Sequence, residues 1–431
     1  MGLDQEKIWS LQHTNIEEVL RSLPPKGFIS EENWERIHGY YMKNAPDSLE
    51  HKNLVTQDMV QFTPGTSSLS GIRDPFITLI DFNDDNGDTF IGTRLSKLFL
   101  FRKNEVVRDS FMLDSPPAHI QYVNRDSVLV LTMGVMDPND QFEGQLVALN
   151  TRKHTQRVLI DSLKRPVHFV EHDMDNDGDK DLIISCFGNF RGSLLVFEAT
   201  KDGFDKHVVH SLPGTRRVFV RDVNSDGKPD LVALITQGDE QMTAFINNGN
   251  FKFQTKILKR FPPVFGSSDF NMLDFDKDGI EDIVYCNGDN ADFSRVLKPY
   301  HGIRIFLGRE PMEFEDSHFL QMDGVFDFAV EDFDGDGDND IAAVAYFPDF
   351  SNSQTSFVYF ENNKSSFTPF SVASSSSGRW ITLETGDFDG DSDIDLVLGA
   401  LNLAQGVPEE QRKMWSENKI SVLLLKNNLV R

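Results

Sequence analysis

The chain has 431 residues, and its 68 Asp and Glu against 42 Lys and Arg give a formal charge of -26. This balance excludes the basic surface that nucleic acids and anionic membranes require. Hydrophobic residues make up 39% of the chain, including 36 Phe, which excludes global disorder, and no apolar run approaches the roughly 18 residues of a membrane span.

Residues 1–50 predict a small helical appendage that is too short to form a core of its own. Asn15 and Glu18 have the spacing of a capping box at the start of one helix. Ser30 is expected to cap a second helix, which Pro46 ends.

An internal repeat dominates the rest of the chain. Five ten-residue segments align without gaps: DMDNDGDKDL from Asp173, DVNSDGKPDL from Asp222, DFDKDGIEDI from Asp274, DFDGDGDNDI from Asp332 and DFDGDSDIDL from Asp387. An alternating segment precedes each one, a short apolar run follows it, and two further strand-like runs complete the unit. About four antiparallel strands in a unit of about 50 residues predict a propeller blade.

Two weaker units precede these five. One surrounds Asp81, and the other, HIQYVNRDSVLVLTMG, keeps its strands but has lost the acidic loop. The sequence therefore predicts an all-β, seven-bladed propeller of four-stranded antiparallel blades over residues 55–431. The last unit lacks a fourth strand, and an unpaired sheet edge is costly, so residues 57–65 are expected to complete the seventh blade and close the ring.

The repeated pattern D-x-D-x-D-G-x-x-D has the spacing of a calcium-binding loop. Side-chain oxygens at positions one, three and five converge on a hard cation, and position seven offers its backbone carbonyl. Glycine at position six permits a turn with positive φ, and Asp at position nine completes the coordination shell. An EF-hand would instead carry Glu at position twelve between two helices. The alternative is a solvated acidic turn, but unpaired carboxylates this close together repel each other.

This interpretation predicts about five calcium sites, which would reduce the formal charge from -26 to about -16. The expected ligand residues are, loop by loop, Asp173, Asp175, Asp177, Asp179 and Asp181; Asp222, Asn224, Asp226, Lys228 and Asp230; Asp274, Asp276, Asp278, Ile280 and Asp282; Asp332, Asp334, Asp336, Asp338 and Asp340; and Asp387, Asp389, Asp391, Asp393 and Asp395.

The loops are not equivalent. Asn224 at position three is an acceptable neutral ligand, whereas Ser392 at position six is expected to strain the turn or change its type. In the loop that begins at Asp81, Asn86 takes position six and Thr89 takes position nine, so this sixth copy is expected to bind weakly or not at all.

These residues resemble the FG-GAP/VCBS repeat family, whose blades resemble those of integrin α-subunit propellers. The resemblance covers about residues 70–430 and implies calcium at the blade loops. Segments 287–307, 345–350 and 378–399 look like a bacterial secreted subgroup of that family. In this subgroup a segment similar to residues 34–49 often ends a c-type cytochrome-like region, but the chain has no CxxCH motif, so haem binding is not carried over.

No catalytic motif is visible, and no catalytic residue is expected. The loops after the second strand are long in blades five to seven, and long loops on one face of a rigid ring are where a ligand site would form. The candidate ligand face comprises Lys298, Tyr300, His301, Phe350 and Trp415. These side chains would suit a glycan or a protein, and the alternative, which we favour, is that they only pack the loops.

The leading hypothesis is a monomeric, calcium-stabilised, non-catalytic propeller that binds a protein or a carbohydrate outside the cytoplasm, where sites of modest affinity fill. No signal peptide is recognisable in MGLDQEKIWS, so an extracellular or periplasmic location requires a segment upstream of Met1. One alternative is a carbohydrate lyase or dehydratase on the same propeller. Another is a docking module of a c-type cytochrome fusion.

Overall fold

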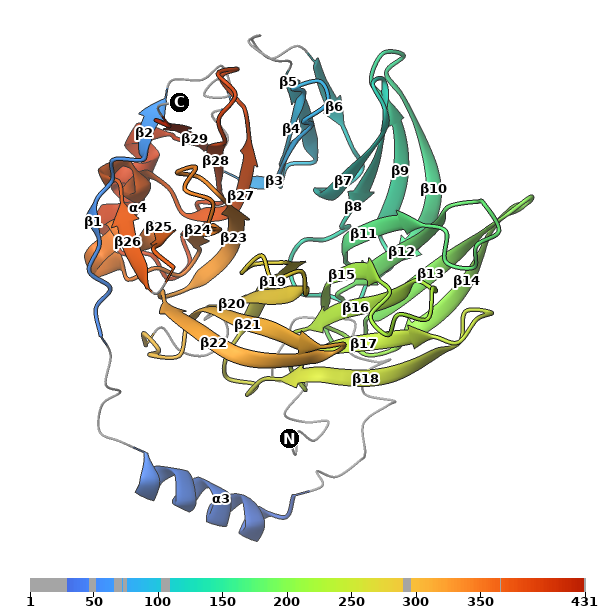
Figure 1. Cartoon of the computed structure of the whole chain (residues 1–431), viewed down its shortest axis with the longest axis horizontal. Coiled ribbons are helices and arrows are strands. Elements are labelled where there is room, and N and C mark those ends of the chain that lie inside the picture. The colour runs from blue at the N-terminus through green and yellow to red at the C-terminus, as the bar shows by residue number, and fades with distance from the viewer. Residues whose placement is uncertain are drawn as a thin grey trace.

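The computed structural model describes residues 29–45, 52–65, 72, 76–101, 109–289, 296–364 and 366–429. Seven sheets are arranged as blades around a central axis (Figure 1). In five of the sheets the four strands follow one another in chain order from the axis outward, and in the other two an N-terminal strand is added at the outer edge. This is the predicted seven-bladed propeller of four-stranded antiparallel blades.

The strands, blade by blade, are β3 (Ile77–Phe82), β4 (Thr89–Thr93), β5 (Lys97–Phe101) and β6 (Asp109–Met112); β7 (Pro117–Asn124), β8 (Ser127–Thr132), β9 (Gly144–Asn150) and β10 (Thr155–Leu163); β11 (Pro166–His172), β12 (Asp181–Cys186), β13 (Ser193–Thr200) and β14 (Gly203–His210); β15 (Thr215–Arg221), β16 (Asp230–Ile235), β17 (Gln241–Asn247) and β18 (Phe253–Arg260); β19 (Ser267–Leu273), β20 (Asp282–Asn287), β21 (Gly302–Glu310) and β22 (Glu313–Gln321); β23 (Val325–Glu331), β24 (Asp340–Ala345), β25 (Phe357–Asn362) and β26 (Phe367–Ser371); and β27 (Trp380–Gly386), β28 (Asp395–Ala400) and β29 (Val422–Asn427).

An N-terminal strand closes the ring. β2 (Phe62–Gly65) pairs antiparallel with β29 as the outer strand of blade seven, with Phe62 opposite Asn427. The expected segment is divided, however, because β1 (Gln57–Asp58) pairs in parallel with β26 and extends blade six instead. Both contacts tie the start of the ring to its end.

The core lies between neighbouring blades. The second strand of each blade is largely apolar and buried. Its side chains join clusters that span neighbouring blades, as Ile184 of blade three does with Phe169 of the same blade and Leu131 of blade two. The innermost strands place polar groups on the axis: Arg217 bonds Asp269 at 2.8 Å.

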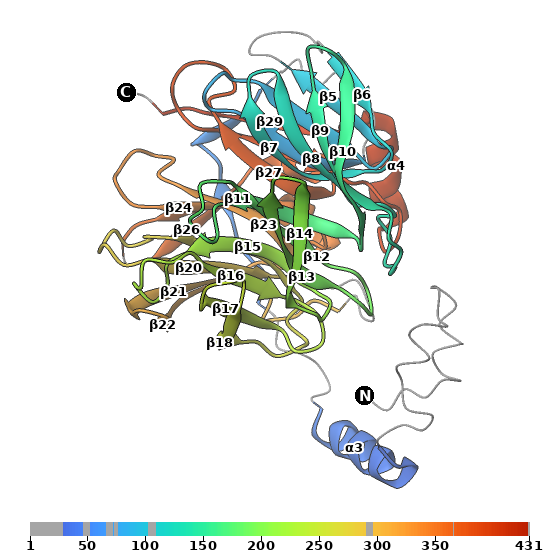
Figure 2. The same cartoon turned by 90° about the vertical axis from the view of Figure 1, so that its right-hand side faces the viewer.

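Helices are few. α3 (Glu31–Asn44) begins at Ser30, whose hydroxyl accepts the backbone N–H of Asn33 at 3.2 Å, as the sequence predicts. No residue of α3 is buried, and the helix stands apart from the ring (Figure 2). α4 (Glu409–Asn418) lies in the long loop of blade seven, and η2 (Phe350–Ser356) and η3 (Ala373–Ser377) are short 3₁₀ segments. The first expected helix, at Asn15, and Pro46 fall outside the described residues.

None of the helices in the described residues is both long and apolar enough to span a membrane.

Candidate metal centres in the acidic loops

The five acidic loops occupy equivalent places in blades three to seven. Each connects the innermost strand to the second strand, and the Asp at position nine is the first residue of that second strand in every case. Antiparallel strands place these connections on one face of the ring, which we call the acidic-loop face. The opposite face carries the connections from second to third strands and from blade to blade.

Two residues of each loop adopt positive φ. Position six does so as predicted, with φ of 97° at Gly178 and 77° at Ser392. Position four does so as well, at Asn176, Ser225, Lys277, Gly335 and Gly390. Two left-handed residues in a span of three make the tight curl that turns the backbone amides inward.

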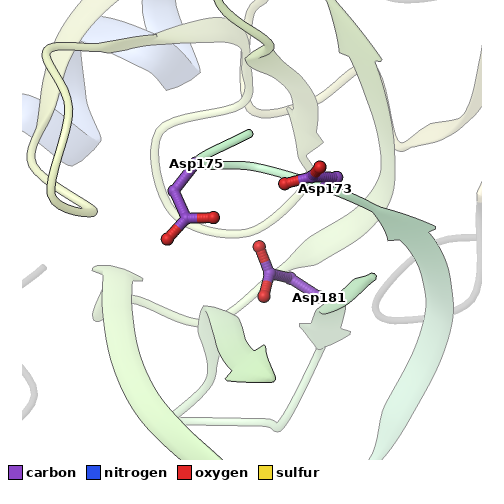
Figure 3. Close-up of side chains that lie close together, drawn as sticks. All are labelled: Asp173, Asp175 and Asp181. Carbon is purple, nitrogen blue, oxygen red and sulfur yellow. The ribbon is translucent and has the colours of Figure 1, made fainter. Parts of the chain in front are cut away.

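The blade-three loop shows how the curl holds its carboxylates. Asp173 accepts the backbone N–H groups of Asp177 at 3.1 Å and Gly178 at 2.9 Å, so its side chain bridges the curl. Asp175 accepts the N–H of Asp177 at 3.3 Å. The carboxylates of Asp173, Asp175 and Asp181 consequently face a common space (Figure 3).

Position nine has a structural role in addition to facing this space. Asp181 is 2% exposed, and its two oxygens accept the N–H of Met174 at 2.9 Å and of Ala199 at 2.8 Å. Asp230, Asp282, Asp340 and Asp395 make the equivalent bonds and are each 0% exposed. The closing Asp thus joins the loop to the third strand of its own blade.

Four loops bring three carboxylates together closely enough to share an ion. The groups are Asp173, Asp175 and Asp181; Asp274, Asp276 and Asp282; Asp332, Asp334 and Asp336; and Asp387, Asp389 and Asp395. In each group one oxygen from every residue lies within 4.8 Å of the others. Oxygen ligands on opposite sides of a calcium ion are about 4.6–5.2 Å apart, twice the Ca–O distance, and carboxylates are the donors calcium prefers, so these residues fit the ion.

The other expected ligands are less closely gathered. In blade four no such group forms among the described residues, because Asn224 replaces one carboxylate. Position seven contributes no side chain to any of the four groups. Asp81 lies within β3 rather than in a loop, and burial raises its pKa to about 7.

The charge balance of the loops also points to a cation. Oδ1 of Asp332 and Oδ1 of Asp393 are buried without a hydrogen-bond partner. Desolvation is the largest effect on the position-nine groups, and it raises the pKa of Asp340 and of Asp395 to about 7. The nearby carboxylates raise these pKa values further, whereas a bound divalent cation would favour the ionised forms.

Blade seven has a cation of its own. Nζ of Lys426, on β29, lies 2.8 Å from Oδ2 of Asp389 at position three. In this loop Asp387 also accepts the N–H of Gly390 at 2.6 Å. The strain or change of turn expected from Ser392 stays a prediction. Lys426 lies in another strand, far along the chain, and the loop pattern gives no signal for it.

The candidate ligand face is largely packed. His301 is 1% exposed and Trp415 is 5% exposed, and Trp415 donates its indole N–H to the carbonyl of Ser376 at 2.9 Å. Tyr300 stacks on Phe265, with ring centroids 5.3 Å apart. Phe350 and Lys298 are half-buried. Burial, reinforced by the charges of Lys298 and Arg304, lowers the pKa of His301 to about 3.

Exposed apolar side chains gather elsewhere on that face, over blades two to four. They are Val135, Phe142, Phe190, Leu212 and Val264. The loops that carry Phe142, Phe190 and Leu212 are bonded to one another: Asp140 accepts the backbone N–H groups of residues 189–191 at 2.9–3.2 Å, and the N–H of Gly214 bonds the carbonyl of Phe187 at 2.9 Å. We call this set the apolar loop patch.

The family comparison agrees with the repeat. The model of the FG-GAP-like repeat matches residues 173–233, 222–285 and 332–398, and these ranges contain all five acidic loops. The chain is an FG-GAP repeat propeller. The finer resemblance of residues 34–49 to the end of a c-type cytochrome region stays a prediction. No curated protein sequence matches this propeller.

Solved structures share the architecture. "Crystal structure of BBS1N in complex with ARL6DN, soaked with lead" aligns with a TM-score of 0.51 at 10% identity, over 86% of this chain and 97% of that one. The mercury-soaked form of the same complex gives a TM-score of 0.50 at 10% identity, with the same shares of the two chains covered. The N-terminal domain of Nup159 aligns with a TM-score of 0.46 at 11% identity, over 88% and 99% of the two chains. At such identities the likeness concerns the fold alone.

Proposed function

We propose that this FG-GAP propeller is a calcium-stabilised, non-catalytic module that binds a protein partner outside the cytoplasm. The observation that carries the proposal is the set of four loops whose carboxylate oxygens lie within 4.8 Å of one another. Calcium would supply the positive charge that balances these carboxylates and would fix the curl of each loop. Sites of this kind in extracellular modules have dissociation constants of about 10⁻⁴–10⁻³ M and fill only outside the cytoplasm.

A binding role is supported by the other face. The apolar loop patch exposes Phe142 by 54%, Phe190 by 43% and Leu212 by 60%, and large exposed apolar groups that are neighbours mark interaction surfaces. Glycans are bound through flat aromatic platforms with polar groups beside them, whereas this patch mixes aromatic and aliphatic side chains. A protein surface is therefore the better fit.

The absence of a catalytic role is supported by the titratable groups. An enzyme would need an acid or a base in these loops, but the imidazole of His301 is buried and burial lowers its pKa to about 3. The same loop uses Tyr300 for stacking on Phe265. These contacts stabilise a loop rather than present an acid or base to a substrate.

The proposal is tested by combining calcium binding with partner capture. Equilibrium dialysis is expected to find at least three calcium ions per chain, and fewer than one would contradict the calcium role. The double variant Phe142→Ser/Phe190→Ser is expected to lose a partner that cross-links to the native protein, since it removes the centre of the apolar loop patch. Val123→Ser, which alters an exposed side chain at a turn on the acidic-loop face, is the matched control and should retain the partner. Equal capture by both variants would exclude the patch as the binding surface.

A further inference from the structure

Asparagines at the ends of third strands connect neighbouring acidic loops. Blades four, six and seven each end their third strand in a pair of asparagines: Asn247 and Asn248, Asn362 and Asn363, and Asn427 and Asn428. In each pair the backbone N–H of the first Asn donates to Oδ1 of the position-nine Asp of its own blade, at 2.7, 2.7 and 2.8 Å respectively. The first Asn of each pair therefore positions the position-nine carboxylate of its own blade.

The side chain of the same residue reaches the preceding blade. Nδ2 of Asn247, in blade four, donates to the carbonyl of Met174 at 3.0 Å. Met174 is position two of the blade-three loop, between the ligand positions Asp173 and Asp175. Asn247 is 3% exposed, so these bonds are made away from water. One buried residue therefore contacts two candidate sites.

Blades six and seven repeat the arrangement. Nδ2 of Asn427 donates to the carbonyl of Phe333, at position two of the blade-six loop, at 2.9 Å. Between blades five and six the link takes two residues, because Asn362 donates to the carbonyl of Asn339 at 3.0 Å and Asn339 donates to the carbonyl of Phe275 at 2.9 Å. Nζ of Lys277 adds a bond to the carbonyl of Gly337 at 2.6 Å across the same boundary.

The boundary between blades four and five uses a different contact. Gly308 takes the place of the first Asn, and its N–H bonds Oδ1 of Asp282 at 2.7 Å. Glycine has no side chain to reach the carbonyl of Val223 at position two of the blade-four loop. Instead Arg221, just before position one of the blade-four loop, donates its Nε–H to Glu281, at position eight of the blade-five loop, at 2.5 Å. Asparagine links therefore join blades three and four and blades five to seven, and an ion pair joins blades four and five.

We propose that these asparagine links make calcium binding cooperative between the blades that they join. The inference rests on the calcium binding proposed above. An ion bound in one loop fixes the peptide group between ligand positions one and three, and the carbonyl of that peptide group then holds the asparagine of the next blade. Because that asparagine also holds the next position-nine carboxylate, the second ion meets a loop that has already lost part of its freedom.

The test isolates one pair of loops. In a parent protein, Asp276→Ala, Asp334→Ala and Asp389→Ala remove the position-three ligands of blades five to seven, so a calcium titration with a competing fluorescent chelator reports blades three and four. The parent is expected to bind with a Hill coefficient above 1. Asn247→Ala keeps the backbone N–H but removes both side-chain donors, and it should weaken binding on the order of fivefold and lower the Hill coefficient to 1. Asn248→Ala, which changes the exposed neighbour, should bind as the parent does.

The possible results separate the two proposals. Two ions that bind the parent independently, with affinities that Asn247→Ala and Asn248→Ala leave equally unchanged, would overturn the coupling while calcium binding itself stands. A single ion bound by the parent would exclude blade four as a site and would overturn the coupling of blades three and four. No calcium binding by the parent or by the unaltered chain would overturn calcium binding and the coupling with it. If Asn247→Ala does not fold, as urea unfolding in EDTA would reveal, Asn339→Ala applies the same test to a parent that retains the loops of blades five and six.

Discussion

Positions three and nine of one loop should respond to mutation in different ways. Asp181, at position nine of blade three, is 2% exposed and accepts two backbone N–H groups at 2.9 and 2.8 Å. Asp181→Ala leaves both buried donors unpaired, at about 1–3 kcal/mol each, so the free energy of unfolding should fall by about 2–6 kcal/mol. This loss does not require calcium and should appear in EDTA.

Asp175, at position three, is exposed and accepts one long hydrogen bond, from the N–H of Asp177 at 3.3 Å. Its pKa is raised by desolvation and then by Asp177, so its charge is slightly unfavourable without an ion. Asp175→Ala should therefore change stability in EDTA by less than about 0.5 kcal/mol. In calcium at about 100 times the dissociation constant the same variant should lose up to about 2.7 kcal/mol, the linkage contribution of one site.

Urea unfolding followed by tryptophan fluorescence, in EDTA and in 10 mM calcium chloride, measures both effects. The expected pattern is an Asp181→Ala deficit in both solutions and an Asp175→Ala deficit in calcium alone. Equal deficits of the two variants in EDTA would show that position three is a structural residue, and the assignment of roles within the loop would be wrong.

Three further predictions follow from the loops. Because desolvation raises the pKa of Asp340 and Asp395 to about 7, the folded protein without calcium binds protons that the unfolded chain does not, and its stability in EDTA should rise as the pH falls from 8 to 5. In calcium the stability should instead fall over this range, because protonation of these carboxylates competes with the ion. Thermal melts that give parallel pH profiles in the two solutions would contradict this. Lys426→Met removes the cation 2.8 Å from Asp389 and should tighten calcium binding in blade seven on the order of fivefold. A chelator titration that shows an unchanged calcium affinity would contradict this prediction. Ser392→Gly relieves a φ of 77° and should stabilise the chain by about 1 kcal/mol in urea, which an equal or lower midpoint would refute.

The ring and the place of the loops could be predicted because both follow from local signals repeated along the chain. Alternating apolar residues define strands, and the position-nine Asp marks the start of the second strand in blades three to seven. The need for positive φ at Gly178 also follows from the pattern alone. Closure by β2 was expected because the last unit lacks an outer strand.

Other features depend on contacts between blades, which no local pattern encodes. Lys426 reaches Asp389 across 37 positions, and Asn247 reaches Met174 across 73. The paired asparagines looked like ordinary turn residues in the sequence. Trp415 looked available to a ligand, but its indole N–H is bonded to Ser376 within the loop cluster. The loop pattern assigns no role to position two, although the carbonyls of Met174, Phe275 and Phe333 at that position accept the bonds that join neighbouring blades.

The central claim, that the acidic loops are structural calcium sites, is tested most directly by thermal melts in 10 mM calcium and in EDTA, with bound calcium counted by calorimetry. Calcium that binds only the native state should add about 2.7 kcal/mol for each site with a dissociation constant near 10⁻⁴ M, so several sites together should raise the melting temperature by many degrees. Identical melts, with no calcium bound, would identify the loops as solvated acidic turns held by their own backbone hydrogen bonds.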